Sequence, residues 1–290
     1  MATRKPLVLV AGRPEELAAG DRLYKVRELL TAARTYYVRT DGNDSNNGLA
    51  NTAGGAFLTI QKAIDTVATL DNGGFDVTIQ VGAGTYVANN ILKSFVGSGI
   101  VNITGAGDTT VIAPNVTGPC FGDSIGSGGW LGIYDITSMK LAPTAASCWG
   151  IGSIWGAGGL AYFGNINFAF AGASGQHLAV GRGGFVGNKD RNYTITNGGA
   201  SIYAHVTAAD GGQIRAQSCT VTLSGTPSFT TAFALADRGG TILTNSNTYS
   251  GSATGPRYNA FRAGGVLTFG GETYLPGNSA GVVTSPGWHA

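Results

Sequence analysis

A pair of adjacent glycines recurs along the chain at nearly even intervals. Six pairs are each followed by a short strand-like run at this spacing, namely Gly128-Gly129, Gly158-Gly159, Gly183-Gly184, Gly211-Gly212, Gly239-Gly240 and Gly264-Gly265. Nine positions after the first glycine of each pair stands a small polar side chain, namely Thr137, Asn167, Asn192, Thr220, Thr248 and Thr273. A period of roughly 25 to 30 residues predicts one structural unit per repeat, stacked on its neighbours.

The segments between the glycines have the pattern of β-strands. Residues 101–104 and 193–196 alternate apolar and polar side chains, which is the period of a strand. Two or three such strands with their turns make one coil, and stacked coils pair strand to strand about 4.8 Å apart. A propeller blade needs about 40 or more residues, and a sandwich keeps no period. We therefore predict an all-β fold, a parallel β-helix solenoid of about eight coils.

The composition fits a chain of short strands and tight turns. Glycine makes up 48 of 290 residues, more than twice its usual share, and only 12% of the residues are charged. Collagen is excluded because glycine does not recur at every third position. The net charge of +2 and the 43% apolar content argue against simple disorder. The early apolar run is too short for a transmembrane helix or a secretory signal, so we expect no membrane insertion.

A segment ahead of the repeat has the period of a helix. Ile60, Ile64, Val67 and Ala68 fall on one face of residues 57–68, and Thr59 is a suitable N-cap. A strand is expected next, at 76–81. We expect this capping helix to lie across the open end of the solenoid, where it would shield the first coil from water and from edge pairing.

Residues 1–39 differ in charge from the rest of the chain. They hold eight Lys or Arg and four Asp or Glu. These basic residues are scattered, so we expect no nucleic-acid binding. An extended arm that docks on another protein is predicted by an apolar run without a partner in the repeat, formed by Pro6, Leu7, Val8, Leu9 and Val10. The predicted organisation is an arm over 1–35, a lead-in segment with the capping helix over 36–75, and the β-helix over 76–290.

Motifs ahead of the repeat resemble a known family. They are residues 41–48 (DGNDSNNG), 56–65 (AFLTIQKAID) and 77–81 (VTIQV), followed by 84–86 (GTY). This series is similar to the start of the pectate-lyase-like right-handed β-helices of bacteriophage tail fibres and tailspikes. The opening residues 3–21 resemble the virion-attachment arm of such proteins, and the end resembles their closing coil, at 275–281 and 287–290.

The resemblance implies a right-handed solenoid that assembles in the host cytoplasm as a homotrimer and is carried on the virion. The implied partners are copies of the chain itself, other virion proteins bound through the arm, and host surface polysaccharide. Two alternatives stay open: a glycan depolymerase tailspike, and a capsid-surface head fibre. The small number of carboxylates favours a structural, host-recognising appendage over a depolymerase. Only the docking partner of the arm would separate a tail location from a head location.

Two aspartates are the candidates for catalysis. Asp210 and Asp237 both lie shortly before a glycine pair, and about one period separates them. On adjacent coils they would stand about 5 Å apart, a separation that suits the paired carboxylates of a glycoside hydrolase. Aspartate before glycine is also favourable turn chemistry. Because the turn already explains both residues, we expect the chain to cleave nothing.

Three tryptophans are the candidates for glycan binding. Trp130, Trp149 and Trp155 fall in neighbouring coils. An exposed indole can stack on the face of a sugar, whereas a buried one packs in the core or at a subunit interface. A surface rich in Thr, Ser and Asn suits hydrogen bonding to neutral glycans, and it equally suits close packing between copies.

No metal or cofactor site is expected. Asp41, Asn43, Asp44 and Asn47 form an oxygen-rich loop that would suit Ca²⁺, but Asx turns account for it more simply. No phosphate-binding or zinc motif is present.

The histidines and cysteines are expected to be structural. His177 and His205 stand one coil apart, which allows a stacked pair, and no third ligand is in register for a metal. Three free, buried thiols are expected at Cys120, Cys148 and Cys219, with the first two stacked on neighbouring coils.

Overall fold

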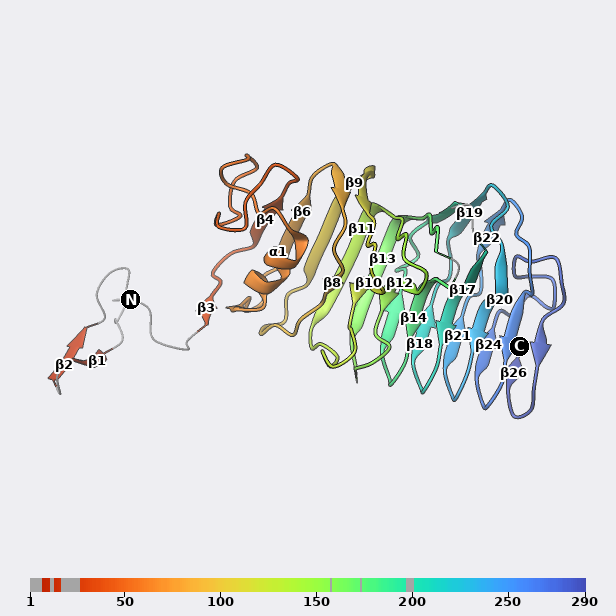
Figure 1. Ribbon diagram of the computed structural model, residues 1–290. Coiled ribbons are helices and arrows are strands. Elements are labelled where there is room, and N and C mark those ends of the chain that lie inside the picture. Colours follow the sequence, from red (N-terminus) through yellow and green to blue (C-terminus); the bar gives the residue numbers. More distant parts are fainter. Residues whose placement is uncertain (1–6, 11–12, 17–26, 157, 173, 197–200) are drawn as a thin grey trace.

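The structure, a computed structural model, describes residues 7–10, 13–16, 27–156, 158–172, 174–196 and 201–290. The described chain is nearly all β and forms a parallel β-solenoid of about seven turns with one short helix (Figure 1). The predicted fold class is confirmed, and the number of turns is close to the expected eight.

The larger sheet has 14 strands, and ten of them pair in one row along the solenoid. From the N-terminal end, the row is β4 (Arg34–Val38), β6 (Val77–Val81), β9 (Val101–Ile112), β11 (Ile133–Leu141), β13 (Leu160–Phe168), β15 (Phe185–Gly187), β18 (Gln213–Arg215), β21 (Thr241–Leu243), β24 (Gly265–Leu267) and β26 (Trp288–His289). Four strands branch from it: β7 (Gly84–Tyr86), β16 (Tyr193–Thr196), β19 (Thr220–Ser224) and β22 (Thr248–Ser250).

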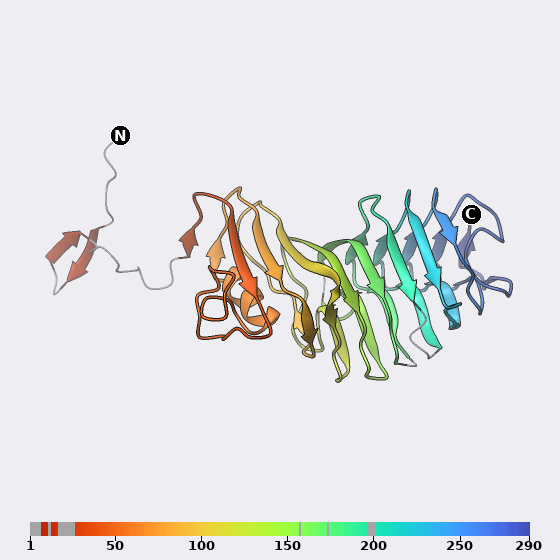
Figure 2. The same ribbon diagram turned by 90° about the horizontal axis from the view of Figure 1, so that it is seen from above.

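The smaller sheet has eight strands, which run side by side from turn to turn (Figure 2). They are β8 (Asn90–Ile91), β10 (Gly118–Gly122), β12 (Cys148–Gly152), β14 (Gln176–Val180), β17 (Ile202–Ala208), β20 (Phe229–Ala236), β23 (Tyr258–Ala260) and β25 (Val282–Val283). A separate parallel pair is formed by β3 (Glu28–Leu29) and β5 (Leu70–Asp71).

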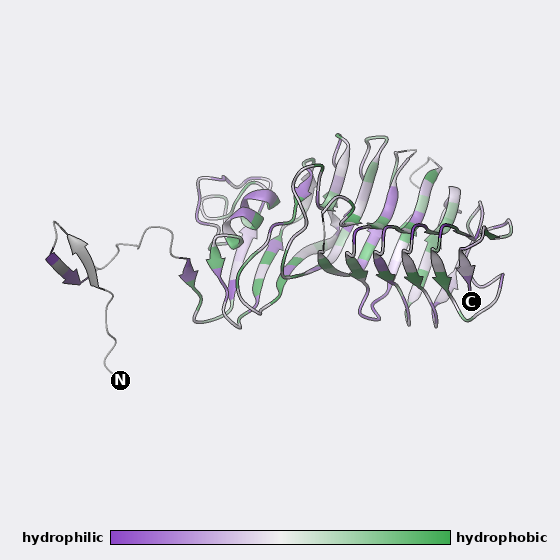
Figure 3. Ribbon diagram, turned by 90° about the horizontal axis from the view of Figure 1, so that it is seen from below, coloured by the Kyte–Doolittle hydropathy of each residue, from purple (hydrophilic) through white to green (hydrophobic). Residues whose placement is uncertain are grey.

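The core is a column of apolar side chains inside the solenoid. Val186, Ile214, Ile242 and Val266 occupy the same position on four successive turns, and each is at most 1% exposed. Successive side chains of a strand point to opposite faces, and Figure 3 shows apolar and polar residues alternating along the strands. Each turn therefore buries its inward row against the turns before and after it.

The paired glycines lie in the connections that lead from the smaller sheet into the larger one. In five of the six pairs the first glycine has a positive φ, for example +76° at Gly211 and +74° at Gly239, a conformation that glycine adopts at little cost. In the sixth pair Ala263 has the positive φ, and Gly264 packs on the preceding turn. The second glycine packs on the preceding turn, because a Cβ at Gly240 would lie 2.2 Å from the carbonyl oxygen of Ala208. Each connection thus needs glycine for a tight turn and then glycine where its backbone approaches the preceding turn, and this requirement recurs along the sequence.

The helix α1 (Ile60–Val67) begins where the sequence predicts it. The Thr59 hydroxyl accepts a hydrogen bond from the backbone N–H of Lys62 at 3.2 Å and caps the helix. Its apolar face is buried at Ile60, Ala63, Ile64 and Val67. The side chain of Gln61 bonds both the N–H and the carbonyl of Ile91, at 2.7 and 3.1 Å, along the edge of β8.

The edge of β4 is also paired at this end. The N–H of Tyr37 donates to the carbonyl of Gly48 at 2.7 Å, and the N–H of Phe57 donates to the carbonyl of Tyr37 at 2.9 Å. Arg39 N–H in turn donates to the carbonyl of Phe57 at 2.9 Å. The lead-in segment and capping helix over 36–75, which we call the capping segment, therefore hydrogen-bond to backbone groups at the edge of the first strand of each sheet. Such bonds prevent pairing of that edge with another chain.

The oxygen-rich loop of the capping segment is organised by its own side chains. Asn43 and Asn47 each accept a hydrogen bond from the backbone N–H two residues ahead, at 2.8 and 3.0 Å, and so form Asx turns. Asp44 accepts from the backbone N–H groups of Leu58 and Thr59, both at 2.9 Å. These contacts agree with the turn interpretation of the loop.

The segment predicted as the arm is described in part. Residues Leu7–Val10 form β1, which pairs antiparallel with β2 (Arg13–Glu16), whereas Pro6 lies outside the described residues. β3 pairs with β5, and Asp71 of β5 bridges to Val96 of the next turn. Pairing with the solenoid therefore begins at Glu28, within residues 1–35.

Candidate functional site

Asp210 and Asp237 lie on adjacent turns, but a guanidinium stands between them. Arg238 forms a bidentate ion pair with Asp210, with Nη2 3.0 Å from Oδ2, and its Nη1 lies 2.6 Å from Oδ2 of Asp237. Arg262 holds Asp237 through Nε and Nη2, at 2.7 and 2.6 Å. Arginine therefore bridges the two carboxylates that the sequence places together.

The register of the connections explains this arrangement. Four successive connections carry a residue with positive φ at the same place, namely Arg182, Asp210, Arg238 and Arg262. The residue one full turn after Asp210 is therefore Arg238, and Asp237 is the residue before it. The N–H of Asp237 donates instead to the carbonyl of Ala208 at 2.9 Å. The arginines of this column were visible in the sequence but were not connected to the aspartates.

The ion pairs determine what this corner can do chemically. The hydrogen bond from Arg238 lowers the pKa of Asp210 below its usual value. The Asp237 side chain is only 9% exposed and contacts two guanidinium groups. A glycoside hydrolase needs one carboxyl that stays protonated beside one that is ionised. Two carboxylates bound by arginine have the chemistry of a structural ion-pair network.

The three tryptophans have different surroundings. Trp130 is 1% exposed and packs edge-on against Tyr134, with ring centroids 6.2 Å apart. Trp149 is 8% exposed, whereas Trp155 is 38% exposed. Trp130 and Trp149 thus fit the packing interpretation, and only Trp155 presents a large part of its ring to solvent.

A buried carboxylate that the sequence did not single out holds Trp155 in place. Asp123, 0% exposed, accepts hydrogen bonds from the backbone N–H groups of Ile154 and Trp155, both at 2.8 Å, and of Gly156 at 2.5 Å. From the next turn, Arg182 Nη1 donates to the carbonyl of Trp155 at 2.6 Å. The loop that carries the indole is therefore fixed from both sides.

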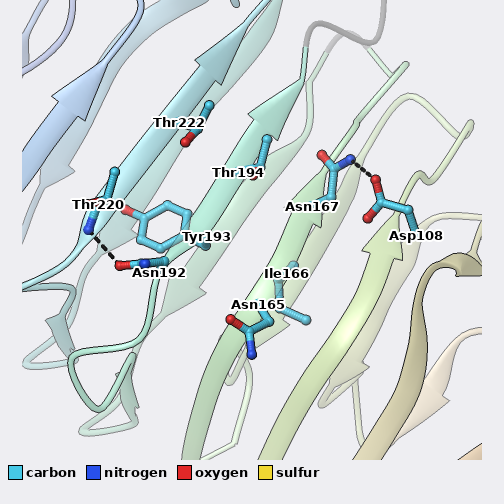
Figure 4. A pocket seen from close by; sticks show the side chains of 9 residues that line it. All are labelled: Asp108, Asn165, Ile166, Asn167, Asn192, Tyr193, Thr194, Thr220 and Thr222. Atoms are coloured by element: carbon cyan, nitrogen blue, oxygen red, sulfur yellow. Dashed lines mark hydrogen bonds between the residues drawn. The ribbon is translucent and has the colours of Figure 1, made fainter.

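A polar groove crosses β13, β16 and β19 on the outside of the solenoid (Figure 4). Its volume is about 200 Å³, and its lining is Asp108, Asn165, Ile166, Asn167, Asn192, Tyr193, Thr194, Thr220 and Thr222. Asn167, Asn192 and Thr220 belong to the small polar position that follows each glycine pair. That repeat was a sequence signal for the groove, although the groove itself was not predicted.

Part of this lining is held by internal hydrogen bonds and part is free. Asn167 donates from Nδ2 to Asp108 at 2.8 Å, and the Oδ1 of Asn192 accepts from the N–H of Thr220, also at 2.8 Å (Figure 4). Among the described residues, no partner holds the side-chain polar groups of Asn165, Thr194 and Thr222. The groove can therefore both donate and accept hydrogen bonds, and its one charged group is Asp108.

His177 and His205 form the stacked pair that the sequence allowed. Their Nδ1 atoms lie 2.9 Å apart, and the hydroxyl of Tyr193 lies 3.0 Å from Nε2 of His205. Burial lowers the pKa of both imidazoles, to about 3 for His205. Among the described residues, no group of three His, Cys, Asp or Glu is placed to hold a metal ion.

The cysteines are buried and free, as expected. In the pairing of β10 with β12, Cys148 lies opposite Gly118 and not opposite Cys120. The expected stacking of the two cysteines on neighbouring coils is therefore wrong. The turn from Gly118 to its partner Cys148 has 30 residues, whereas the turn from Gln176 to its partner Ala204 has 28. Cys148, 28 residues after Cys120, therefore lies two positions out of register with it.

Comparisons with known proteins give no information on the function of the chain. No known protein family, curated protein or solved structure matches the chain. In the part of the chain that the structure describes, no helix has the length and apolar character needed to cross a membrane.

Proposed function

We propose that this protein is a homotrimeric structural appendage of a bacteriophage particle, of the tail-fibre or tailspike type. It docks on the virion through residues 1–35 and binds polysaccharide on the host surface without cleaving it. The observation that carries the binding role is the polar groove across β13, β16 and β19. The virion role is supported by the family resemblance of the sequence and by a rod whose capped end lies next to the arm.

The groove has the chemistry that a neutral sugar chain requires. Sugar hydroxyls donate and accept hydrogen bonds, and so do the free amide of Asn165 and the hydroxyls of Thr194 and Thr222. Thr194 and Thr222 stand opposite each other on β16 and β19. Because neighbouring strands are about 4.8 Å apart, the groove offers a repeating set of partners across successive turns, which suits an extended polymer.

The expected absence of cleavage is supported by the contacts of the carboxylates. Asp210 and Asp237 are bound to arginines, and Asp108 is hydrogen-bonded to Asn167 at the groove. None of these arrangements leaves two carboxyl groups free to face each other across a cleft, which glycoside hydrolysis needs. The depolymerase tailspike stays the alternative in which Asp108 or the corner network acts on the glycan, and the capsid-surface fibre stays the alternative for the docking position.

The experiment is binding to an array of purified bacterial O-antigen and capsular polysaccharides, followed by size analysis of the bound sugar. We expect the chain to bind at least one polysaccharide and leave its length unchanged. A triple variant, Asn165→Ala with Thr194→Val and Thr222→Val, should lose affinity at least about tenfold, since it removes three sets of hydrogen-bonding groups.

The matched control is Thr230→Val on β20, another exposed threonine, outside the groove. It should bind like the unmodified chain. The proposal of a glycan-binding groove fails if no polysaccharide binds, or if the triple variant binds as well as the control. Shortened sugar chains would instead establish the depolymerase alternative.

A further inference from the structure

One edge of the solenoid changes its chemistry half-way along its length. The connections that lead into the row of the larger sheet, from β3 and β5 at the N-terminal end and from the smaller sheet after them, form this edge, which we call the connecting edge. Its segments are 30–33, 72–76, 92–100, 123–132, 153–156 with 158–159, 181–184, 209–212, 237–240 and 261–264. The last four segments carry the charged column of Arg182, Asp210, Arg238 and Arg262.

The first half of the connecting edge, together with the adjoining end of β3, exposes large apolar side chains instead. They are Leu29 at 60% exposure, Phe75 at 41%, Val96 at 42%, Ile125 at 79%, Leu131 at 73% and Trp155 at 38%. Every turn from β3 to the connection before β13 contributes at least one of them.

Backbone contacts place the segments that carry these side chains next to one another on neighbouring turns, and we call the six residues the apolar strip. Leu29 of β3 lies opposite Asp71, and Asp71 bridges to Val96 of the next turn. The N–H of Phe95 donates to the carbonyl of Leu131 at 3.3 Å. On the following turn, the loop that carries Trp155 is bonded to Asp123, two residues before Ile125.

The strip is as large as the largest apolar patch that a soluble monomer usually exposes. Its six residues leave on the order of 600 Å² accessible, which is at the upper limit for a soluble monomer and approaches the ~800 Å² that each partner buries in a stable interface. The charges beside it already have partners. Asp76 accepts a hydrogen bond from the N–H of Ile100 at 2.8 Å, and Lys93 pairs with Asp65 at 2.7 Å. A partner that covers the strip would therefore bury few charged groups that lack a partner.

We infer that the apolar half of the connecting edge binds a second copy of this chain, side by side and in parallel. The inference rests on the self-association in the proposed function and names its surface. The strip runs along the rod with at least one residue per turn, so a second rod of the same length can cover all of it. A compact partner would match only a patch of it.

The charge pattern of the edge decides the orientation. In a parallel pair, apolar half meets apolar half. In an antiparallel pair of full overlap, the exposed ion pairs of Arg238 and Arg262 would lie against Leu131 and Phe75. Removing ion pairs from water against an apolar surface is costly. The parallel arrangement also brings the N-terminal segments of all copies to one end of the assembly.

The first test is the oligomeric state of the full chain by sedimentation equilibrium. The unmodified chain should sediment as a multiple of 29.4 kDa. The double variant Ile125→Asn with Leu131→Asn should weaken association at least about tenfold. Val116→Asn is the matched control, because Val116 is 56% exposed but lies in the connection between β9 and β10. The far-UV circular dichroism spectra should be the same for all three, since the altered side chains are exposed and the fold of the single chain is unchanged.

The second test is cross-linking with a short bis-maleimide. The three native thiols are buried, so Leu131→Cys introduces one accessible thiol per chain and should cross-link to the same residue of another copy. A cross-link between Leu131→Cys and Arg238→Cys chains, without the Leu131 homodimer, would contradict the parallel orientation. An oligomer unaffected by the Asn double variant would overturn this surface and leave the glycan-binding proposal standing. A monomeric chain would overturn both the surface and the homotrimer.

Discussion

At the scale of single residues, the first glycine of a pair such as Gly211-Gly212 and the second glycine of a pair such as Gly239-Gly240 are required for different reasons. Gly211 has a φ of +76°, and a Cβ added to it would meet no atom within 4 Å, so its conformation alone requires glycine. Gly240 has an ordinary φ, but a Cβ there would lie 2.2 Å from the backbone oxygen of Ala208. The first glycine allows the turn, and the second allows two turns of the solenoid to approach.

Alanine at the two positions should therefore have unequal effects. Gly211→Ala should cost about 1–2 kcal/mol, the penalty for a side chain in the left-handed region. Gly240→Ala should cost more than about 3 kcal/mol, because backbone atoms cannot move aside without separating the strands. Chemical unfolding of both variants measures the difference. Equal losses would show that close approach between turns does not constrain the second glycine.

Residue spacing predicted some of these positions and missed others. The glycine period predicted the solenoid and its corners, because every turn repeats the same backbone requirement. The same period misplaced Asp237, since a shift of one residue was enough to put Arg238 between it and Asp210. Spacing also could not separate the buried Trp130 from the exposed Trp155, because burial depends on which way each connection folds.

At the scale of elements, β14 and β17 are joined by a pair of buried imidazoles. His177 and His205 share one hydrogen bond between their Nδ1 atoms, so one ring donates, the other accepts, and both are neutral. Phe168 stacks on His177, with ring centroids 4.9 Å apart. Protonating either ring would place a charge in this aromatic core. That cost is why burial holds the pKa values of both histidines below their ordinary range.

Stability should therefore fall as the pH is lowered. The unfolded chain takes up a proton on each histidine below about pH 6.5, whereas the folded chain does not, so acid favours the unfolded state. For two such groups the loss between pH 7.5 and pH 5 is on the order of 4 kcal/mol. Urea unfolding at the two pH values measures it. A free energy of unfolding that stays constant over this range would contradict a neutral buried pair.

The capping helix was the element most fully predicted from sequence. Its N-cap and its apolar face follow from local pattern, because helical period and capping act over only a few residues. Its position between β4 and β6, which pair with each other, was not predicted. The groove was harder to foresee. Asn165, Thr194 and Thr222 come from three different strands, and their meeting depends on the pairing register between turns, which no single segment determines.

At the scale of the whole molecule, the two ends of the rod differ. The capping segment pairs with the first strand of each sheet, through Gln61 on β8 and through Phe57 on β4. At the other end, among the described strands, β25 and β26 each pair on one side only. In the proposed appendage, the arm binds the particle, the polar groove binds glycan, and the apolar strip binds neighbouring copies.

The central claim is that this chain is displayed on a phage particle and held there by its N-terminal residues. Immunogold electron microscopy of purified particles, with antibody against residues 76–290, tests it most directly. Particles made with the full chain should carry gold on their outer surface. Particles made with a chain of residues 27–290, which keeps β3 and the whole solenoid, should carry none although the shortened protein is folded. Unlabelled particles with the full chain left free in the lysate would contradict the account.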